Sequence, residues 1–330
     1  MKVFITGATG YLGNRLAHSL AEQGNQVHAL VRNKSAAKNV HHQNITLFEG
    51  DVLLRDTITP AIMGCTHAYH TAAMVKLCSR KPGALYSVNV DGTNNVLGEA
   101  YEQGVRKVVC TSSCGVLGNS VKEPMRETDP RISSFDNDYE LSKSMAEKVA
   151  SDYASKGLFV TIVRPSKIFG PGPETHPISV NQIIKLFLER KVAFMPSPAS
   201  VLANYCFIDD VVKGCQRAIS HGVSGEKYIL GGENVSYYDF FQRLRSITGI
   251  KGILVPAPRY LVQGVAVAVK IASQFSSNDP FITAKGVKHL YANKAYSSNR
   301  AICQLGYQIT SLNEGLEKTV QFLKSNNYAS

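Results

Sequence analysis

The clearest chemical signal in this sequence is a tyrosine and a lysine four residues apart, Tyr139 and Lys143 in the segment YELSK. On a helix, two side chains at this spacing lie on the same face. Tyrosine titrates near ~10 and is a poor acid–base catalyst at neutral pH, but a nearby cation favours the phenolate. Ser113 ends the segment TSS after an expected strand, far enough upstream for a loop and a helix start. We therefore predict proton transfer at a substrate oxygen by Ser113, Tyr139 and Lys143.

A glycine-rich segment, TGATGYLG, occupies residues 6–13 between an expected strand and an expected helix. Gly7 permits a tight turn, Gly10 lets the backbone approach a pyrophosphate, and Gly13 lets the helix pack close to the strand. The N-terminus of that helix then faces the phosphates with free N–H groups. The segment predicts a dinucleotide-binding site.

The end of the second expected strand indicates which dinucleotide binds. An acidic residue at this point usually accepts a hydrogen bond from a ribose 2′-OH, but the sequence here reads VRNK over residues 31–34. Arg32 can pair with a 2′-phosphate in a forked geometry, and Lys34 and Lys38 follow closely. We predict that NADP(H) is favoured, with NAD(H) as the alternative.

Stepping along the chain, short apolar runs alternate with helical patterns. Strands are predicted at 3–6, 27–31, 45–48, 68–71, 107–111 and 159–163, and helices at 11–23, 84–103 and 137–156. This alternation predicts an α/β fold, a Rossmann-type doubly wound parallel sheet with helices on both faces. We expect a dinucleotide-binding domain at 1–170, to which 205–232 returns through a strand at 228–230. A smaller, mostly helical substrate-binding lobe is expected at 171–204 and 233–330.

Composition narrows the class of protein. The 330 residues are 44% hydrophobic and 18% charged, which is ordinary for a globular protein. The net charge is +11, and from residue 251 onward nine Lys/Arg face three Asp/Glu. No block of Lys/Arg and no nucleic-acid motif is present, so we expect no nucleic-acid partner. Seven scattered cysteines and an N-terminus without a signal peptide favour a cytoplasmic location.

One apolar segment, Tyr260–Phe275, has two interpretations. It is too short to span a membrane and contains Lys270. We expect a buried or dimer-interface helix. The alternative is a membrane-surface helix within the basic C-terminal region, which would make the enzyme peripheral to a membrane.

Further motifs follow in a characteristic order: GD at 50–51, HTAA at 70–73, NVDGT at 89–93, RPSKIFGPG at 164–172, FIDDV at 207–211 and YILGG at 228–232. Together with the glycine loop, TSS and YxxxK, they resemble the extended short-chain dehydrogenase/reductases, the NAD-dependent epimerase/dehydratase superfamily. The resemblance covers nearly the whole chain. It is greatest to the dihydroflavonol-reductase-like and hopanoid-associated epimerase-like groups, and the 3β-hydroxysteroid dehydrogenases are more distant relatives.

This resemblance implies a role for each matching residue. Tyr139 would exchange a proton with a carbonyl or alcohol oxygen, which Ser113 would hydrogen-bond. Lys143 would lower the pKa of Tyr139 and hold the nicotinamide ribose, and Asp51 would lie beside the adenine. The cofactor would supply the hydride.

The resemblance also implies the walls of the cofactor channel, to which His70 would contribute. The predicted cofactor-binding set is Gly7, Thr9, Gly10, Tyr11, Leu12, Gly13, Arg32, Asp51, Val52, Thr71, Ala72, Ala73, Tyr139, Lys143 and Pro165. No metal site is expected.

Departures from the family patterns separate the candidate reactions. Nucleotide-sugar dehydratases carry an acidic pair after the strand-end hydroxyl, where this chain has Cys114 and Gly115. Epimerases commonly have an asparagine where this chain has Lys167. We therefore predict an NAD(P)-dependent oxidoreductase that reduces a carbonyl compound or oxidises the matching alcohol. A nucleotide-sugar epimerase is the alternative, and a non-catalytic dinucleotide-binding sensor is a third interpretation, although such proteins tend to lack the Tyr or Lys.

The resemblance implies a small-molecule carbonyl or alcohol as the substrate and a homodimer or a monomer as the assembly. Substrate contacts are expected from loops at 74–77 and 174–181 and from the C-terminal helices.

Overall fold

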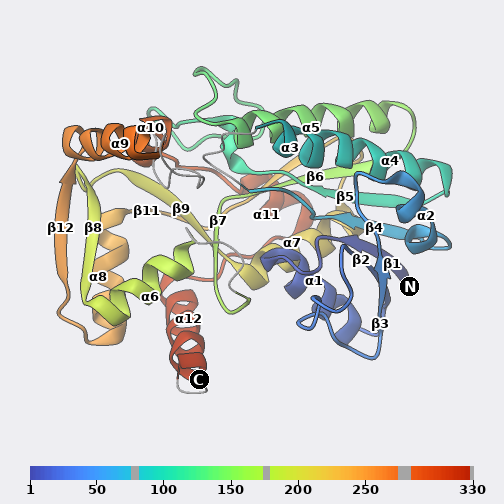
Figure 1. Cartoon of the computed structure of the whole chain (residues 1–330), viewed down its shortest axis with the longest axis horizontal. Helices are drawn as coiled ribbons and strands as arrows, with labels where there is room; N and C mark the ends of the chain where they lie inside the picture. Colours follow the sequence, from blue (N-terminus) through green and yellow to red (C-terminus); the bar gives the residue numbers. More distant parts are fainter. Residues whose placement is uncertain (76–81, 174–178, 274–283, 328–330) are drawn as a thin grey trace.

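The computed structural model describes residues 1–330 except 76–81, 174–178, 274–283 and 328–330. A parallel sheet of seven strands, in the order β10-β6-β5-β4-β1-β2-β3, forms its centre (Figure 1). The strands are β1 (Lys2–Thr6), β2 (Gln26–Val31), β3 (Ile45–Glu49), β4 (His67–His70), β5 (Lys107–Thr111), β6 (Phe159–Pro165) and β10 (Lys227–Leu230). The predicted doubly wound sheet is confirmed, and β10 pairs in parallel with β6.

Helices cover both faces of this sheet. Those of one face are α1 (Tyr11–Glu22) and α7 (Ile208–His221), and those of the other are α2 (Arg55–Ile62), α4 (Gly92–Glu102) and α5 (Asp138–Ser155). Side chains alternate across each strand. In β1, Val3 and Ile5 belong to the core cluster of the α1 and α7 face, while Phe4 belongs to the cluster of the opposite face. Because both faces are buried, the strands read as continuous apolar runs.

The helix predicted at 84–103 is divided in the structure. It consists of α3 (Pro82–Tyr86), a π-helical turn (Ser87–Asp91) and α4. Within the turn, the buried Asn89 side chain accepts a hydrogen bond from the Met74 N–H and donates to the Met74 carbonyl and the Ser142 hydroxyl. Through these hydrogen bonds the Asn89 side chain joins the π-helical turn to α5. π-Helical turns of this kind are frequent at functional sites.

The remaining elements build the second part of the molecule. A three-stranded sheet contains β7 (Lys167–Phe169), β9 (Leu202–Phe207) and β11 (Glu233–Ser236), and a two-stranded parallel ribbon contains β8 (Val192–Ser197) and β12 (Ile253–Pro258). The helices are α6 (Val180–Arg190), α8 (Tyr237–Thr248), α9 (Arg259–Ser273), α10 (Ala284–Leu290), α11 (Asn299–Leu305) and α12 (Leu312–Asn327). The C-terminal part is therefore helical, as predicted, with two small sheets in addition.

The apolar segment predicted as a buried helix is instead an exposed one over its described side chains. Helix α9 exposes 71% of Tyr260, 56% of Leu261, 51% of Val265 and 56% of Val267, and buries Ala266. The reason is that, among the described residues, α9 packs mainly against β12 and α10. The dimer-interface and membrane-surface interpretations stay predictions. No helix among the described residues has the length and apolarity that crossing a membrane requires.

Candidate active site

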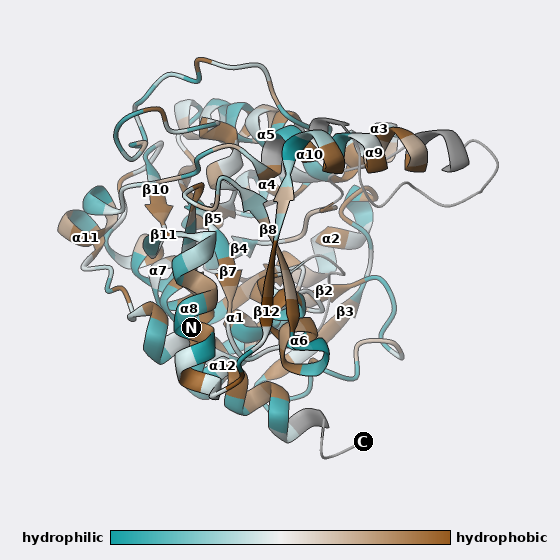
Figure 2. Ribbon diagram, turned by 90° about the vertical axis from the view of Figure 1, so that its left-hand side faces the viewer, coloured by the Kyte–Doolittle hydropathy of each residue, from teal (hydrophilic) through white to brown (hydrophobic). Residues whose placement is uncertain are grey.

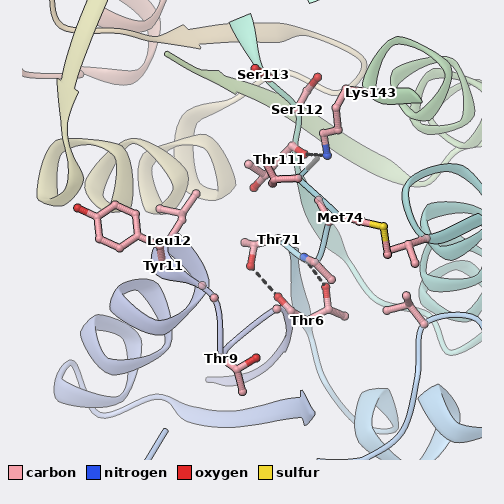
Figure 3. Close-up of a pocket in the computed structure, with 18 of the residues that line it drawn as sticks. Thr6, Thr9, Tyr11, Leu12, Thr71, Met74, Thr111, Ser112, Ser113 and Lys143 are labelled. Carbon is pink, nitrogen blue, oxygen red and sulfur yellow. Dashed lines mark hydrogen bonds between the residues drawn. The ribbon is translucent and has the colours of Figure 1, made fainter. Parts of the chain in front are cut away.

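A cleft of about 610 Å³ opens at the carboxyl ends of β1, β4 and β5 (Figure 3). Ligands of doubly wound sheets bind at this edge. Every residue predicted to bind the cofactor or to act in catalysis lines the cleft. The predicted set omitted eleven other lining residues: Thr6, Leu30, Val31, Gly50, Met74, Val75, Val88, Thr111, Ser112, Ser166 and Ile168. Most of these residues are neighbours in sequence of a predicted residue. Ser166 and Ile168 lie on either side of Lys167 in an extended segment, so their side chains point to the same side.

The glycine loop is shaped by backbone contacts that exclude side chains. Gly7 has φ +76°, and a Cβ there would lie 2.6 Å from the Ala72 nitrogen, while a Cβ on Gly13 would lie 2.2 Å from the Gly7 carbonyl oxygen. The loop is tied to β4 because Thr71 Oγ1 donates to the Thr6 carbonyl at 2.7 Å. No side chain caps the N-terminus of α1 at Gly10. The cradle therefore fits a pyrophosphate, which would accept hydrogen bonds from the first N–H groups of α1.

His70 does not line the cleft, contrary to the expectation from the resemblance. Its ring is buried, with Nδ1 2.8 Å from Thr6 Oγ1 and Nε2 3.0 Å from Thr93 Oγ1. Burial lowers the pKa of His70 to about 3, so the ring is neutral. Its place is behind the glycine loop, where it joins β1, β4 and α4.

Helix α5 places the two predicted catalytic side chains one turn apart. It begins after Asn137, whose side chain accepts a hydrogen bond from the Glu140 N–H at 2.9 Å. Burial raises the pKa of Tyr139 to about 12, and a hydrogen bond with the Ser113 hydroxyl partly opposes that shift. Tyr139 thus carries its proton at neutral pH, with Ser113 as its neighbour.

The Lys143 side chain is buried beside the end of β5, and its expected lowering of the Tyr139 pKa stays a prediction. Its ammonium donates to the Thr111 carbonyl at 2.5 Å (Figure 3), so the charge is directed to the end of β5. Burial lowers the pKa of Lys143 to about 8. The site therefore combines a protonated phenol with a buried amine that titrates just above neutrality.

Two sets of ion pairs hold α5 in place. Arg164 on β6 makes a bidentate pair with Glu147, at 2.8 Å for Nε–Oε1 and 2.7 Å for Nη2–Oε2, and both side chains are buried. Glu140, the residue after Tyr139, pairs with Arg131 at 2.8 Å and with Lys294 at 3.2 Å. The first pair joins α5 to the large sheet and the second joins it to the C-terminal part.

Cys114 and Lys167 stand at the two positions that distinguish the candidate reactions, and both side chains make hydrogen bonds within the protein. Cys114 is buried, its thiol donates to the Arg164 carbonyl, and burial raises its pKa well above the usual value. It therefore offers no acid or base beside Ser113. Lys167 donates from its ammonium to the Tyr237 hydroxyl at 2.7 Å.

Just beyond the end of β2 lies one cation that lines the cleft, and an acid that the sequence analysis missed lies beside it on β3. Arg32 is exposed and lines the cleft, whereas Lys34 and Lys38 do not. The missed acid is Glu49 at the end of β3, whose Oε2 accepts from the Lys34 N–H at 3.4 Å. Val31 pairs with Glu49 in the parallel register of β2 and β3. A prediction of that register would have placed Glu49 at the end of β2.

Comparisons with known proteins agree with this geometry. A family model described as "NAD dependent epimerase/dehydratase family" matches residues 3–231. The chain is 32% identical to a Synechocystis protein named "Putative dihydroflavonol 4-reductase", over 98% of this chain and 95% of that protein. It is 31% identical to "Sterol demethylase protein B" of Methylococcus capsulatus, over 98% of each. The structure of a UDP-glucose 4-epimerase from Thermotoga maritima has the same fold, with TM-score 0.83, 21% identity and coverage of 99% of this chain and 100% of that one.

Proposed function

We propose that this chain, which belongs to the NAD-dependent epimerase/dehydratase family, reduces the carbonyl group of a small molecule or oxidises the matching alcohol, with Tyr139 as general acid–base. It is an NAD(P)-dependent oxidoreductase of the extended short-chain dehydrogenase/reductase type. The observation that carries the proposal is the placement of Tyr139, hydrogen-bonded to Ser113, on the wall of the cleft that the glycine loop also lines.

In this reaction Ser113, Tyr139 and Lys143 orient the substrate oxygen, supply its proton and stabilise negative charge. A bound nicotinamide supplies the hydride. Ser113 Oγ accepts the Gly115 N–H at 3.1 Å, and its hydroxyl also hydrogen-bonds Tyr139, so both hydroxyls can contact one substrate oxygen. Tyr139, protonated at neutral pH, donates the proton that the oxygen needs as it becomes an alcohol. The Lys143 cation stabilises negative charge that develops nearby.

Reduction is favoured over the family's other reactions by the side chains around this set. Water elimination needs an acid and a base beside Ser113, where the buried Cys114 thiol is protonated. The asparagine typical of nucleotide-sugar epimerases is replaced by Lys167, whose ammonium is engaged with Tyr237. The names of two relatives, a dihydroflavonol reductase and a sterol demethylase protein, make ring ketones the first compounds to test.

For the cofactor, we propose a preference for NADPH over NADH that depends on Arg32. Arg32 lines the cleft and presents a planar fork of donors suited to a 2′-phosphate. One charge-assisted contact contributes roughly 1.5–3 kcal/mol, which is about tenfold or more in affinity. Titration of each coenzyme, followed by its own fluorescence in a chain without tryptophan, should show this ratio in the wild type and its loss in Arg32→Ala.

Two further variants separate a specific contact from general surface charge. Glu49→Gln removes a carboxylate that accepts from the Lys34 N–H just beyond β2, and it should raise the preference for NADPH. Lys34→Ala removes a cation that does not line the cleft and should change it little. Equal affinities in the wild type, or an unchanged preference in Arg32→Ala, would show that Arg32 is only a surface charge.

The buried amine of Lys143 predicts the pH dependence of carbonyl reduction. Its pKa is lowered to about 8, so it is cationic below that pH and neutral above it. Tyr139, with a pKa of about 12, keeps its proton throughout. The turnover number for reduction should be level below about pH 7 and decline above about pH 8. The Lys143→Met variant should have a low turnover number that does not decline in this pH range. A wild-type turnover number that stays level to about pH 9 would contradict the role given to the Lys143 cation.

A further inference from the structure

The ribbon of β8 and β12, together with α9, forms an exposed apolar surface away from the cleft. Figure 1 shows the two strands along one edge of the molecule, with α9 following β12, and Figure 2 shows apolar stretches along α9 where it extends from the body. On the ribbon, Phe194 is 73% exposed and Ile253 is 64% exposed. Phe194 pairs with Val255 in the parallel register. Since Ile253 is two residues before Val255, these side chains lie on one face of the ribbon.

Helix α9 continues this surface with an exposed face that is almost free of charge. Leu261 and Val265, one turn apart, are both more than half exposed, and so are Tyr260 and Val267. A surface helix ordinarily places charged residues on its solvent side. Between Arg259 and Lys270 this helix has none, and its one buried described side chain is Ala266 on the opposite side.

Cations border the apolar surface. Arg190 and Lys191 end α6 and enter β8, Lys251 precedes β12, and Arg259 begins α9, all of them exposed. The Ile253 N–H donates to the Lys191 carbonyl at 2.8 Å, so the Lys191 backbone lies beside the exposed isoleucine. No Asp or Glu occurs from Arg245 to Val269. Apart from Glu189 beside Arg190, the described charged residues that border the surface are cations, so the surface combines apolar side chains with an excess of positive charge.

We propose that this surface, the α9–ribbon surface, docks on an anionic lipid bilayer. An interfacial helix buries its apolar side at the boundary of headgroups and acyl chains, while neighbouring lysines and arginines attract anionic headgroups. Charge complementarity selects this occupant over a second copy of the chain, because two copies of the surface would bring their cations together. The site is independent of the cleft, so its test needs no substrate.

The test is co-sedimentation with vesicles of phosphatidylcholine containing about one third phosphatidylglycerol. The protein should bind these vesicles at low salt, and binding should fail with pure phosphatidylcholine. It should also fail at about 1 M salt, where the Debye length is only about 3 Å. The double variant Val265→Asp/Val267→Asp should lower binding by about tenfold or more, since it places carboxylates against anionic lipid. Lys191→Glu/Lys251→Glu should do the same, because each cation near such a membrane is worth roughly a fivefold change.

A matched control is Val223→Asp, which changes a valine of similar exposure, 54%, at the end of α7. It should bind as the wild type does. Failure of the wild type to bind anionic vesicles would overturn the proposal, as would equal binding to neutral vesicles or full binding by both double variants. A wild-type dimer that Val265→Asp/Val267→Asp converts to a monomer, without lipid binding, would assign the surface to a second copy instead.

Discussion

Replacing Tyr139 with phenylalanine is expected to lower the turnover number by at least ~10²-fold, the usual scale of general acid–base catalysis. Only a hydroxyl is lost, and that hydroxyl is the proton donor beside Ser113. The glycine loop and Arg32 are untouched, so the dissociation constant for NADPH should stay close to the wild-type value. The measurement is steady-state turnover with a ring ketone, together with a coenzyme titration of the same preparation.

The matched control is Tyr153→Phe on the same helix. Tyr153 makes only long hydrogen bonds, at 3.4 Å, to Asn94 and does not line the cleft. Its variant should turn over substrate like the wild type. If Tyr139→Phe also keeps wild-type turnover, Tyr139 is not the proton donor. If it loses coenzyme binding in parallel with turnover, Tyr139 holds the coenzyme or the fold of the cleft and is not shown to be the proton donor.

Removing Glu147 is expected to cause the largest loss of stability. The single variant Glu147→Ala would leave the Arg164 guanidinium buried on β6 without its bidentate partner. Breaking a buried pair in this way costs about 3–5 kcal/mol, because the remaining charge is uncompensated. Urea unfolding followed by circular dichroism measures the change, and activity should fall with it because α5 carries both Tyr139 and Lys143.

Two controls distinguish the buried charge from the lost contacts. Glu314→Ala breaks an exposed pair with Lys318, both about half exposed, and should cost less than about 1 kcal/mol. The double variant Arg164→Met/Glu147→Met removes both charges and should be more stable than Glu147→Ala. A Glu147→Ala protein as stable as Glu314→Ala would show that the pair does not hold α5.

The parts of this protein that the sequence predicted are those determined by local pattern. Short apolar runs located the strands of the sheet to within one or two residues, because both faces of that sheet are buried. The glycine loop was recognisable because Gly7 and Gly13 stand where a Cβ would meet backbone atoms. The cleft lining followed from these elements, since the carboxyl ends of parallel strands converge at one edge.

What the sequence did not predict depends on contacts between distant segments. The π-turn in the helix predicted at 84–103 depends on Asn89 meeting Met74 and Ser142. Glu49 comes near the Lys34 backbone only through the β2–β3 register. The raised pKa of Tyr139 reflects its burial by surrounding elements, which the spacing of Tyr139 and Lys143 does not reveal. The exposure of α9 depends on which sides of that helix find neighbours, and its apolar composition alone suggested burial.

The central claim is that the coenzyme is consumed in reducing a carbonyl. It is tested most directly by incubating the enzyme and a ring ketone with NADPH that carries deuterium at the transferred position. The account predicts an alcohol with deuterium on the former carbonyl carbon, and NADP⁺ formed in equal amount, because hydride passes to the substrate and Tyr139 supplies the proton. Conversion of a nucleotide-sugar into its epimer with no net oxidation of coenzyme, and no alcohol from any ketone tested, would contradict it.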